Sequence, residues 1–203
     1  MTRRHTPTSW FIAIGASGAD GLIDIRALLA ALSPSLDATV LVVLHRPWEH
    51  ISRLQSVLAR SSSMPVIVAA DGERLASGVV YIGEPADHLT LVSRSFGELV
   101  RDPAKLHRNR TVDLLFHSVA KHGGKRIVGV VLSGSLDDGA RGLAAINAAG
   151  GLSMVLTPDM SGSAGMPEHA INYDGPIDVI GCTIDIAAAI NEVASARPLA
   201  TVA

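Results

Sequence analysis

Residues 10–21 read WFIAIGASGADG, an apolar run that passes into a turn whose glycines are spaced three apart around Ser17. A short apolar run bounded by turn residues is typical of a buried strand. Apolar residues then recur at helical spacing as far as Leu32, where Ser33 and Pro34 end the pattern. A strand followed at once by a tight turn and a helix predicts an α/β unit with a parallel sheet.

The same alternation of strand and helix patterns continues along the chain, most clearly in its C-terminal half. We therefore expect a three-layer α/β fold, in which a doubly wound, mostly parallel sheet carries helices on both faces. Short apolar runs at 66–69, 79–82 and 89–92 predict a small antiparallel extension of that sheet. The polar residues 93–110 predict a long loop over one face.

The composition is that of one ordinary globular domain. The chain has 203 residues, 48% of them hydrophobic and only 3% aromatic, with a formal net charge of −2. We expect no nucleic-acid partner, because the chain lacks a basic surface and aromatic stacking platforms. The basic cluster at 105–110 is interpreted as a solvated loop or docking spot. Residues 1–9 are expected to form a flexible lead-in, 10–195 the folded domain and 196–203 a tail.

Cysteine usage and the N-terminal sequence indicate a cytoplasmic protein. Cys182 is the sole cysteine, which excludes an intramolecular disulfide, and its apolar neighbours predict a small buried side chain. Arg3 and Arg4 precede an apolar stretch as in an export signal, but the stretch is too brief and leads into the turn with Asp20. No apolar run is long enough to predict insertion into a membrane.

Three residues with complementary chemistry each follow a predicted strand. Ser17 follows the first apolar run, His45 stands directly after residues 40–44, and Asp138 follows residues 127–132. In a parallel sheet these positions share the carboxyl edge, where open α/β sheets build their sites. A hydroxyl, an imidazole and a carboxylate are together the parts of a nucleophilic acyl-transfer site, so we predict such a site at this edge.

The turn at Ser17 has three interpretations. A dinucleotide-binding loop is one, but the glycines follow G-x-x-G-x-x-G, and His45 stands where a ribose-binding carboxylate is wanted. A second is that Ser17 caps the helix that follows. In the third, Ser17 is a nucleophile whose oxyanion is held by the unpaired N–H groups of that helix, although Ala19 departs from the G-x-S-x-G nucleophile elbow.

His45 and the two aspartates carry similar alternatives. His45 is either a satisfied core histidine or a general base, the latter if the first two strands are neighbours. Asp137 and Asp138 precede a predicted helix that either can cap, whereas an orienting carboxylate must be partly shielded, which we expect of only one of them. The other histidines lack metal-binding spacing, so we expect no metal.

Six short segments occur in a fixed order along the chain, and together they indicate a family more specifically than any one of them does alone. They are residues 14–18, the strand that ends in His45, and residues 79–89, 111–116, 130–140 and 165–167. Together they resemble the catalytic domain of the chemotaxis protein-glutamate methylesterases (CheB). The resemblance covers nearly the whole chain.

The resemblance implies a serine hydrolase that demethylates glutamate methyl esters on chemotaxis-receptor-like signalling proteins, releases methanol and in some members also deamidates glutamine. The family's nucleophile, base and orienting carboxylate fall on Ser17, His45 and Asp138. Gly18 and Ser135 are expected to contact the oxyanion or the substrate. A methyl-accepting receptor or a related signalling protein is the implied partner, and no metal or cofactor is implied.

The loops around these positions depart from the family pattern. The usual Ser-Thr-Gly-Gly is Ser-Gly-Ala-Asp at 17–20, Gln-His-Met-Pro is Leu-His-Arg-Pro at 44–47, and Thr-Gly-Met-Gly is Ser-Gly-Ser-Leu at 133–136. Asp20 therefore adds a negative charge near the expected oxyanion. The family's usual phospho-receiver domain is not found before the first strand, so a separate response regulator becomes a candidate partner. The alternative to catalysis is a binding or regulatory module that kept the fold and lost turnover.

Overall fold

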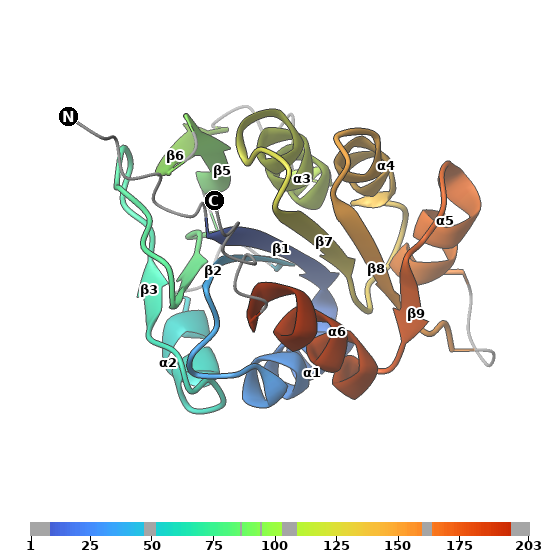
Figure 1. Ribbon diagram of the computed structural model, residues 1–203, viewed down its shortest axis with the longest axis horizontal. Helices are drawn as coiled ribbons and strands as arrows, with labels where there is room; N and C mark the ends of the chain where they lie inside the picture. The colour runs from blue at the N-terminus through green and yellow to red at the C-terminus, as the bar shows by residue number, and fades with distance from the viewer. Residues whose placement is uncertain are drawn as a thin grey trace, which may run out of the picture.

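The computed structural model describes residues 9–46, 52–85, 87–93, 95–102, 109–159 and 164–195. Within these ranges seven strands form one sheet in the order β3-β4-β2-β1-β7-β8-β9, with every neighbouring pair parallel (Figure 1). The predicted lead-in, apart from its last residue, and the predicted tail lie outside them. The strands are β1 (Trp10–Ser17), β2 (Ala38–His45), β3 (Val66–Val68), β4 (Val79–Ile82), β7 (Ile127–Val131), β8 (Leu152–Leu156) and β9 (Val179–Gly181).

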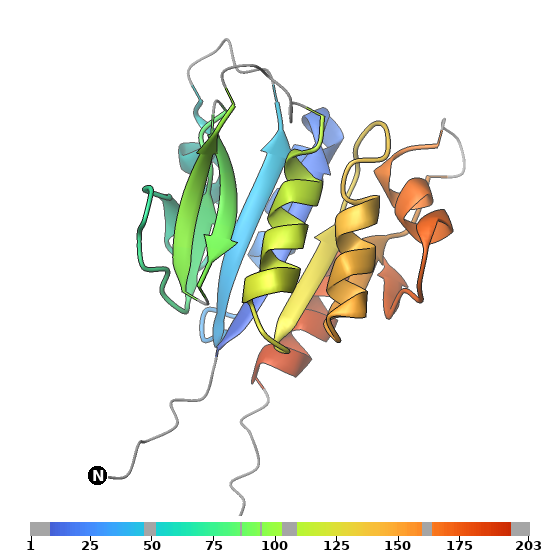
Figure 2. The ribbon, with the colours of Figure 1, turned by 90° about the horizontal axis from the view of Figure 1, so that it is seen from above.

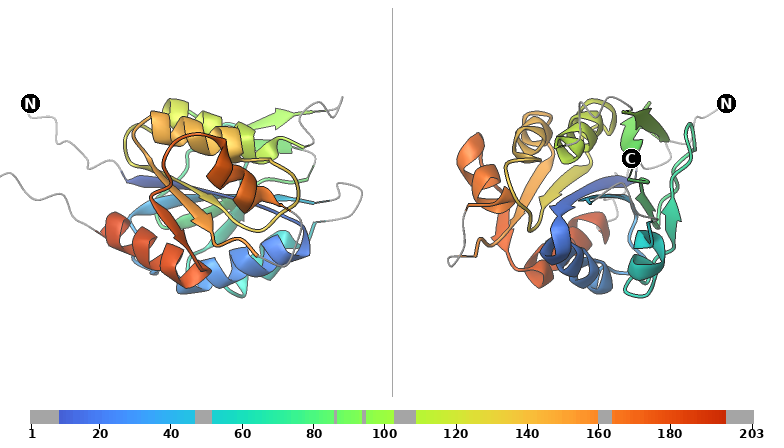
Figure 3. Two further views of the ribbon diagram at one scale, coloured as in Figure 1. Left: turned by 90° about the vertical axis from the view of Figure 1, so that its right-hand side faces the viewer. Right: turned by 180° about the vertical axis from the view of Figure 1, so that it is seen from behind.

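The predicted three-layer, doubly wound architecture is confirmed. Figure 3 shows helices on both faces of the sheet. One face packs against α1 (Gly18–Ala31), α2 (Leu54–Ala59) and α6 (Thr183–Ser195), and the other against α3 (Thr111–His122), α4 (Ala140–Ala148) and α5 (Met166–Tyr173). Strand β1 is accordingly apolar on both sides: Ile12 and Ile14 pack into one layer, and Phe11 and Ala13 into the other.

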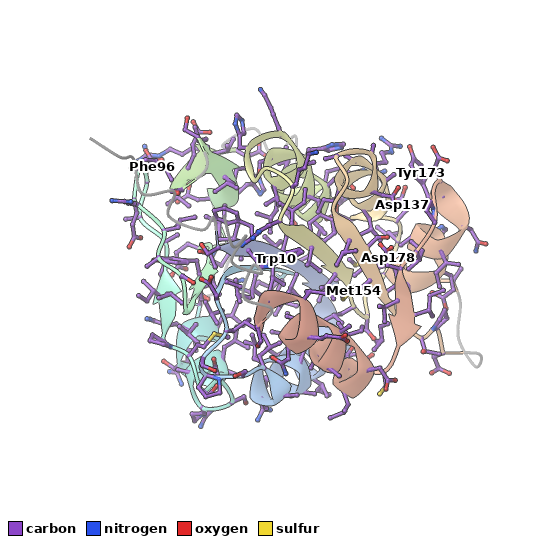
Figure 4. All side chains as sticks on the ribbon, viewed as in Figure 1. Trp10, Phe96, Asp137, Met154, Tyr173 and Asp178 are labelled. Atoms are coloured by element: carbon purple, nitrogen blue, oxygen red, sulfur yellow. The ribbon has the colours of Figure 1, made fainter. Side chains whose placement is uncertain are left out.

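A separate antiparallel hairpin, β5 (Asp87–Val92) and β6 (Phe96–Arg101), lies beside α3 on the same face of the main sheet (Figure 2). It is tied to α3 by a hydrogen bond of 2.9 Å that the Leu91 N–H donates to Ser118 Oγ. Phe96 of the hairpin and Tyr173 of α5 lie near opposite edges of the molecule (Figure 4). The small antiparallel extension is therefore present as its own sheet.

The strands predicted for that antiparallel extension were partly wrong. The runs at 66–69 and 79–82 form β3 and β4, which are parallel strands of the main sheet. Strand β6 occupies part of the predicted loop at 93–110, because Glu98 and Arg101 interrupt the apolar pattern of a strand that is largely solvent-facing. Most of the basic cluster at 105–110 lies outside the described residues.

The prediction that Cys182 is buried was wrong. Its side chain is exposed, because the residue follows the edge strand β9 and its N–H donates to Asp185 Oδ2 at 3.0 Å, which turns the chain into α6. Among the residues described here, the helices are too short or too polar to cross a lipid bilayer.

Helices α3 and α4 pack most closely at Gly142. A Cβ atom there would lie 2.5 Å from Phe116 Cβ and 3.1 Å from Asp113 Cα. We expect Gly142→Ala to lower the free energy of unfolding by about 2 kcal/mol, because forcing the helices apart outweighs the gain in helix propensity. Urea denaturation measures the change, and an unaltered midpoint would contradict this close packing.

Candidate active site

Ser17 and His45 are brought together by strand register. Strands β1 and β2 are parallel neighbours, and their last residues, Ser17 and His45, are direct partners in the ladder. Ser17 Oγ lies 3.4 Å from His45 Nδ1. This is a long contact for a hydroxyl that donates to an imidazole. The sheet thus places a hydroxyl and a potential base side by side at its carboxyl edge.

The turn after Ser17 favours a reactive serine over a capping one. Ser17 occupies the N-cap position of α1, yet its hydroxyl makes no capping hydrogen bond to the described backbone of that helix. Gly18 follows with φ of +74°, a left-handed conformation that glycine adopts without strain. The first N–H groups of a helix have no partner within it, so those of Gly18, Ala19 and Asp20 are suited to bind an oxyanion.

Asp138 is buried beside this pair and caps a helix, though not the one that follows it. Its Oδ1 accepts from the Asp113 N–H at 2.9 Å and its Oδ2 from the Val112 N–H at 3.0 Å, both in the first turn of α3. The Thr111 hydroxyl also donates to Asp138 Oδ2, at 3.4 Å. Burial raises the pKa of Asp138 to about 6, although the two N–H bonds oppose that change.

Asp113 makes the reciprocal contact. Its Oδ1 accepts from the N–H groups of Gly139 at 3.0 Å and Gly142 at 2.8 Å, so α3 and α4 cap one another through two buried carboxylates. Asp137, in contrast, has a side chain that is 44% exposed and binds Arg110 at 3.1 Å. Of the two adjacent aspartates, only Asp138 is shielded from water.

A small pocket joins these groups. Ser17, His45, Asp138 and Ser135 all line it, whereas Gly18 lies beside it at the start of α1. Three further lining residues, Asn109, Leu136 and Met166, had no role predicted from the sequence. Met166 belongs to the motif at 165–167. The full set of lining residues is Ser17, His45, Asn109, Ser135, Leu136, Asp138 and Met166.

The segment between β7 and Asp138 is fixed against the nucleophile. The Ser17 N–H donates to Ser133 O at 2.9 Å, and the Met166 N–H donates to Gly134 O at 2.8 Å. Leu136 has φ of +68°, a left-handed conformation that costs a leucine about 1 kcal/mol or more. The pocket wall is therefore held from both sides in a conformation that the leucine itself disfavours.

Gly134 is the point at which this wall touches Ser17. A Cβ atom on Gly134 would lie 2.8 Å from Ser17 Cβ and 3.0 Å from Ser17 N. We expect Gly134→Ala to lower kcat about 100-fold, because a displacement of even 1 Å of a nucleophile has effects of that order. Turnover of an ester measures the loss, and kcat within threefold of the unmodified protein would contradict the contact.

Arg46 fixes the chain immediately after the histidine. Its Nη2 donates to Gly83 O and to Ser52 Oγ, each at 3.0 Å, and its Nη1 to Leu44 O at 3.3 Å. Burial lowers the pKa of Arg46, while Glu84 opposes the change. The guanidinium thus ties the end of β2, next to His45, to the end of β4.

Among the residues described, no cluster of histidine, cysteine or carboxylate side chains is arranged to hold a metal ion.

The chain is similar to known proteins along most of its length. The sequence matches the CheB methylesterase family model over residues 12–190. The protein-glutamate methylesterase/protein-glutamine glutaminase of Salmonella typhimurium is 36% identical over 172 residues, which are 83% of this chain and 49% of that protein. The protein of the same name from Yersinia pestis is 36% identical over 182 residues, which are 87% of this chain and 52% of that protein.

The fold agrees as well. The crystal structure of the Thermotoga maritima CheB methylesterase catalytic domain matches with a TM-score of 0.82 and 25% sequence identity, covering 91% of this chain and 98% of that one. The chain spans about half the length of the Salmonella and Yersinia relatives, at 49% and 52%. The segment that matches the family model includes Ser17, His45 and Asp138. This chain belongs to the CheB methylesterase family.

Proposed function

We propose that this chain is a protein-glutamate methylesterase that uses Ser17 as nucleophile, His45 as general base and Asp138 as the carboxylate that orients and stabilises the imidazole. The observation that carries the proposal is the 3.4 Å contact of Ser17 Oγ with His45 Nδ1 in a pocket that Asp138 also lines. The names of the Salmonella and Yersinia relatives supply the substrate class. Asp20, in the exposed first turn of α1, is the charge that opposes an anionic substrate.

In the first half of the reaction, Ser17 Oγ attacks the γ-carbonyl carbon of an esterified glutamate while His45 Nδ1 takes the hydroxyl proton. This use of Nδ1 leaves the Nε2–H group for Asp138. The Gly18 N–H, together with Ser135 of the pocket lining, stabilises the oxyanion of the tetrahedral intermediate. The intermediate collapses, the protonated His45 gives its proton to the leaving methoxide, and methanol departs.

In the second half, water attacks the acyl group on Ser17 with His45 again as base, which releases glutamate and restores the serine. An amide follows the same route with ammonia as leaving group, so we include deamidation of glutamine in the proposal. Neither step calls for a metal or a cofactor.

The proposed partner is a methyl-accepting receptor or a related signalling protein, with the reaction placed in the cytoplasm and a separate response regulator as candidate regulator. We take residues 10–195 as the catalytic unit, because β1 begins at Trp10 and α6 ends at Ser195. We include no nucleic acid among the partners and no membrane insertion.

Methanol release from methylated receptor cytoplasmic fragments tests the proposal. The protein is incubated with fragments of several receptors, and Ser17→Ala serves as the control. We expect release that stops in the variant. No release from any fragment would contradict the proposal and favour the binding module that has lost turnover.

A further inference from the structure

Leu136 combines two unfavourable features at the mouth of the pocket. Its backbone is left-handed, with φ of +68°, and its side chain is 60% exposed to water. A glycine would adopt that backbone freely and would expose no apolar surface. Non-glycine residues in this conformation cluster at functional sites, where the surrounding structure holds them in place.

The surrounding structure does hold Leu136. Two residues before it, Gly134 O accepts from the Met166 N–H at 2.8 Å. On its other side, Asp137 is bound to Arg110 at 3.1 Å, and Asp138 is locked onto the first turn of α3. The leucine is therefore fixed on the wall of the pocket that Ser17 and His45 also line.

We propose that Leu136 is a specificity-determining residue, which binds an aliphatic side chain of the substrate protein next to the esterified glutamate. This inference rests on the proposed function. The methyl ester is small and is engaged at Ser17, so a leucine on the pocket wall is placed to touch what flanks the ester. On a substrate helix, the residues three or four positions away share the face of the glutamate and lie about 5–6 Å from it. An aliphatic residue there covers Leu136 and removes its exposed surface from water.

Three substrates separate this role from a purely structural one. The first is an N-acetylated glutamate γ-methyl ester with no neighbours. The second is a helical peptide with one central glutamate γ-methyl ester and leucines three and four positions away, and the third has serines in place of those leucines. Each is assayed with the unmodified protein, with Leu136→Gly and with Leu136→Asn. Both glycine and asparagine tolerate the left-handed backbone at this position. Ile184→Ala is the matched control, because Ile184 is 63% exposed but lies on α6 and outside the pocket lining.

We expect both Leu136 variants to lower kcat/KM for the leucine peptide about tenfold more than for the small ester or the serine peptide, mainly through KM. Ile184→Ala should change none of the three. Equal losses on all three substrates would overturn the proposal, since Leu136 would then only shape the pocket. Equal losses on the two peptides alone would also overturn it, because the aliphatic neighbours would play no part.

Binding separates a failure of this inference from a failure of the proposed function. The fluorescein-labelled leucine peptide is titrated into Ser17→Ala and into Ser17→Ala combined with Leu136→Gly, and anisotropy reports the Kd. A tenfold weaker Kd in the double variant upholds the role of Leu136 even if no ester is turned over. An equal Kd, or no binding to either protein, overturns it.

Discussion

Replacing Ser17 by alanine is expected to lower kcat for ester hydrolysis by about 10⁴-fold or more, because loss of a triad nucleophile leaves only the contribution of binding and oxyanion stabilisation. Stability should change little, since the Ser17 hydroxyl is bonded to His45 and does not cap α1. The measurement is steady-state turnover of a glutamate methyl ester together with the thermal midpoint of each protein.

Replacing a second serine of the pocket separates loss of the nucleophile from a general effect of removing a hydroxyl group there. Ser135 lines the same pocket but carries no nucleophilic role in the mechanism, so Ser135→Ala should retain turnover within about 100-fold, the effect of losing a single oxyanion contact. Turnover by Ser17→Ala at a tenth of the original rate would show that another group attacks the ester.

Asp138→Asn is expected to lower kcat/KM by about 10³-fold or more, because a neutral amide cannot stabilise the imidazolium that forms on His45. In the unmodified protein, kcat/KM should rise with pH through about 6, where burial places the pKa of Asp138, because the carboxylate forms there. Asp137→Asn is the matched control. Asp137 is exposed and bound to Arg110, so that variant should keep the rate and the pH profile. A profile that is flat between pH 5 and 7 would contradict this role of Asp138.

Stability should move in the opposite direction to activity over the same range of pH. Folded Asp138 keeps its proton up to about pH 6, whereas in the unfolded chain it is lost near the ordinary value of 3.8. The folded state therefore binds more protons between these values, and the contribution of Asp138 to stability is lost as pH rises through them. We expect the free energy of unfolding of the unmodified protein, minus that of Asp138→Asn, to fall by about 2 kcal/mol between pH 4 and pH 7. A difference that grew with pH would contradict the burial of this carboxylate.

The sheet and the proximity of Ser17 to His45 could be predicted from the sequence, because the ends of parallel strands meet at one edge of the sheet. An apolar run that stops at Ser17 and another that stops at His45 become neighbours in a parallel sheet, and the register then places the two side chains opposite one another. The hairpin was harder to predict, since β6 is only partly buried and its Glu98 and Arg101 give no continuous apolar signal.

The contacts that hold the site depend on tertiary structure and escaped sequence reasoning. The role of Asp138 toward His45 stays a prediction, and the expected capping of α4 by Asp138 gives way to a cap on α3, whose first turn lies 25 and 26 residues earlier in the chain. The return contact from Asp113 and the left-handed backbone of Leu136 have no local signature either. The contacts of Asp138 and Asp113 are hydrogen bonds between residues far apart in the sequence, and the two helices that they join pack closely at Gly142. The conformational preferences of single residues do not predict such contacts.

The proposed mechanism requires that Ser17 is acylated during ester hydrolysis, which mass spectrometry of the quenched reaction detects. The protein is mixed with a short peptide that carries a glutamate γ-methyl ester, stopped with acid within the first turnovers and digested with trypsin. We predict that the tryptic peptide spanning residues 5–26 gains the mass of the substrate minus methanol, with the modification on Ser17. Methanol release with an unmodified Ser17, or with the added mass on another residue, would contradict the account.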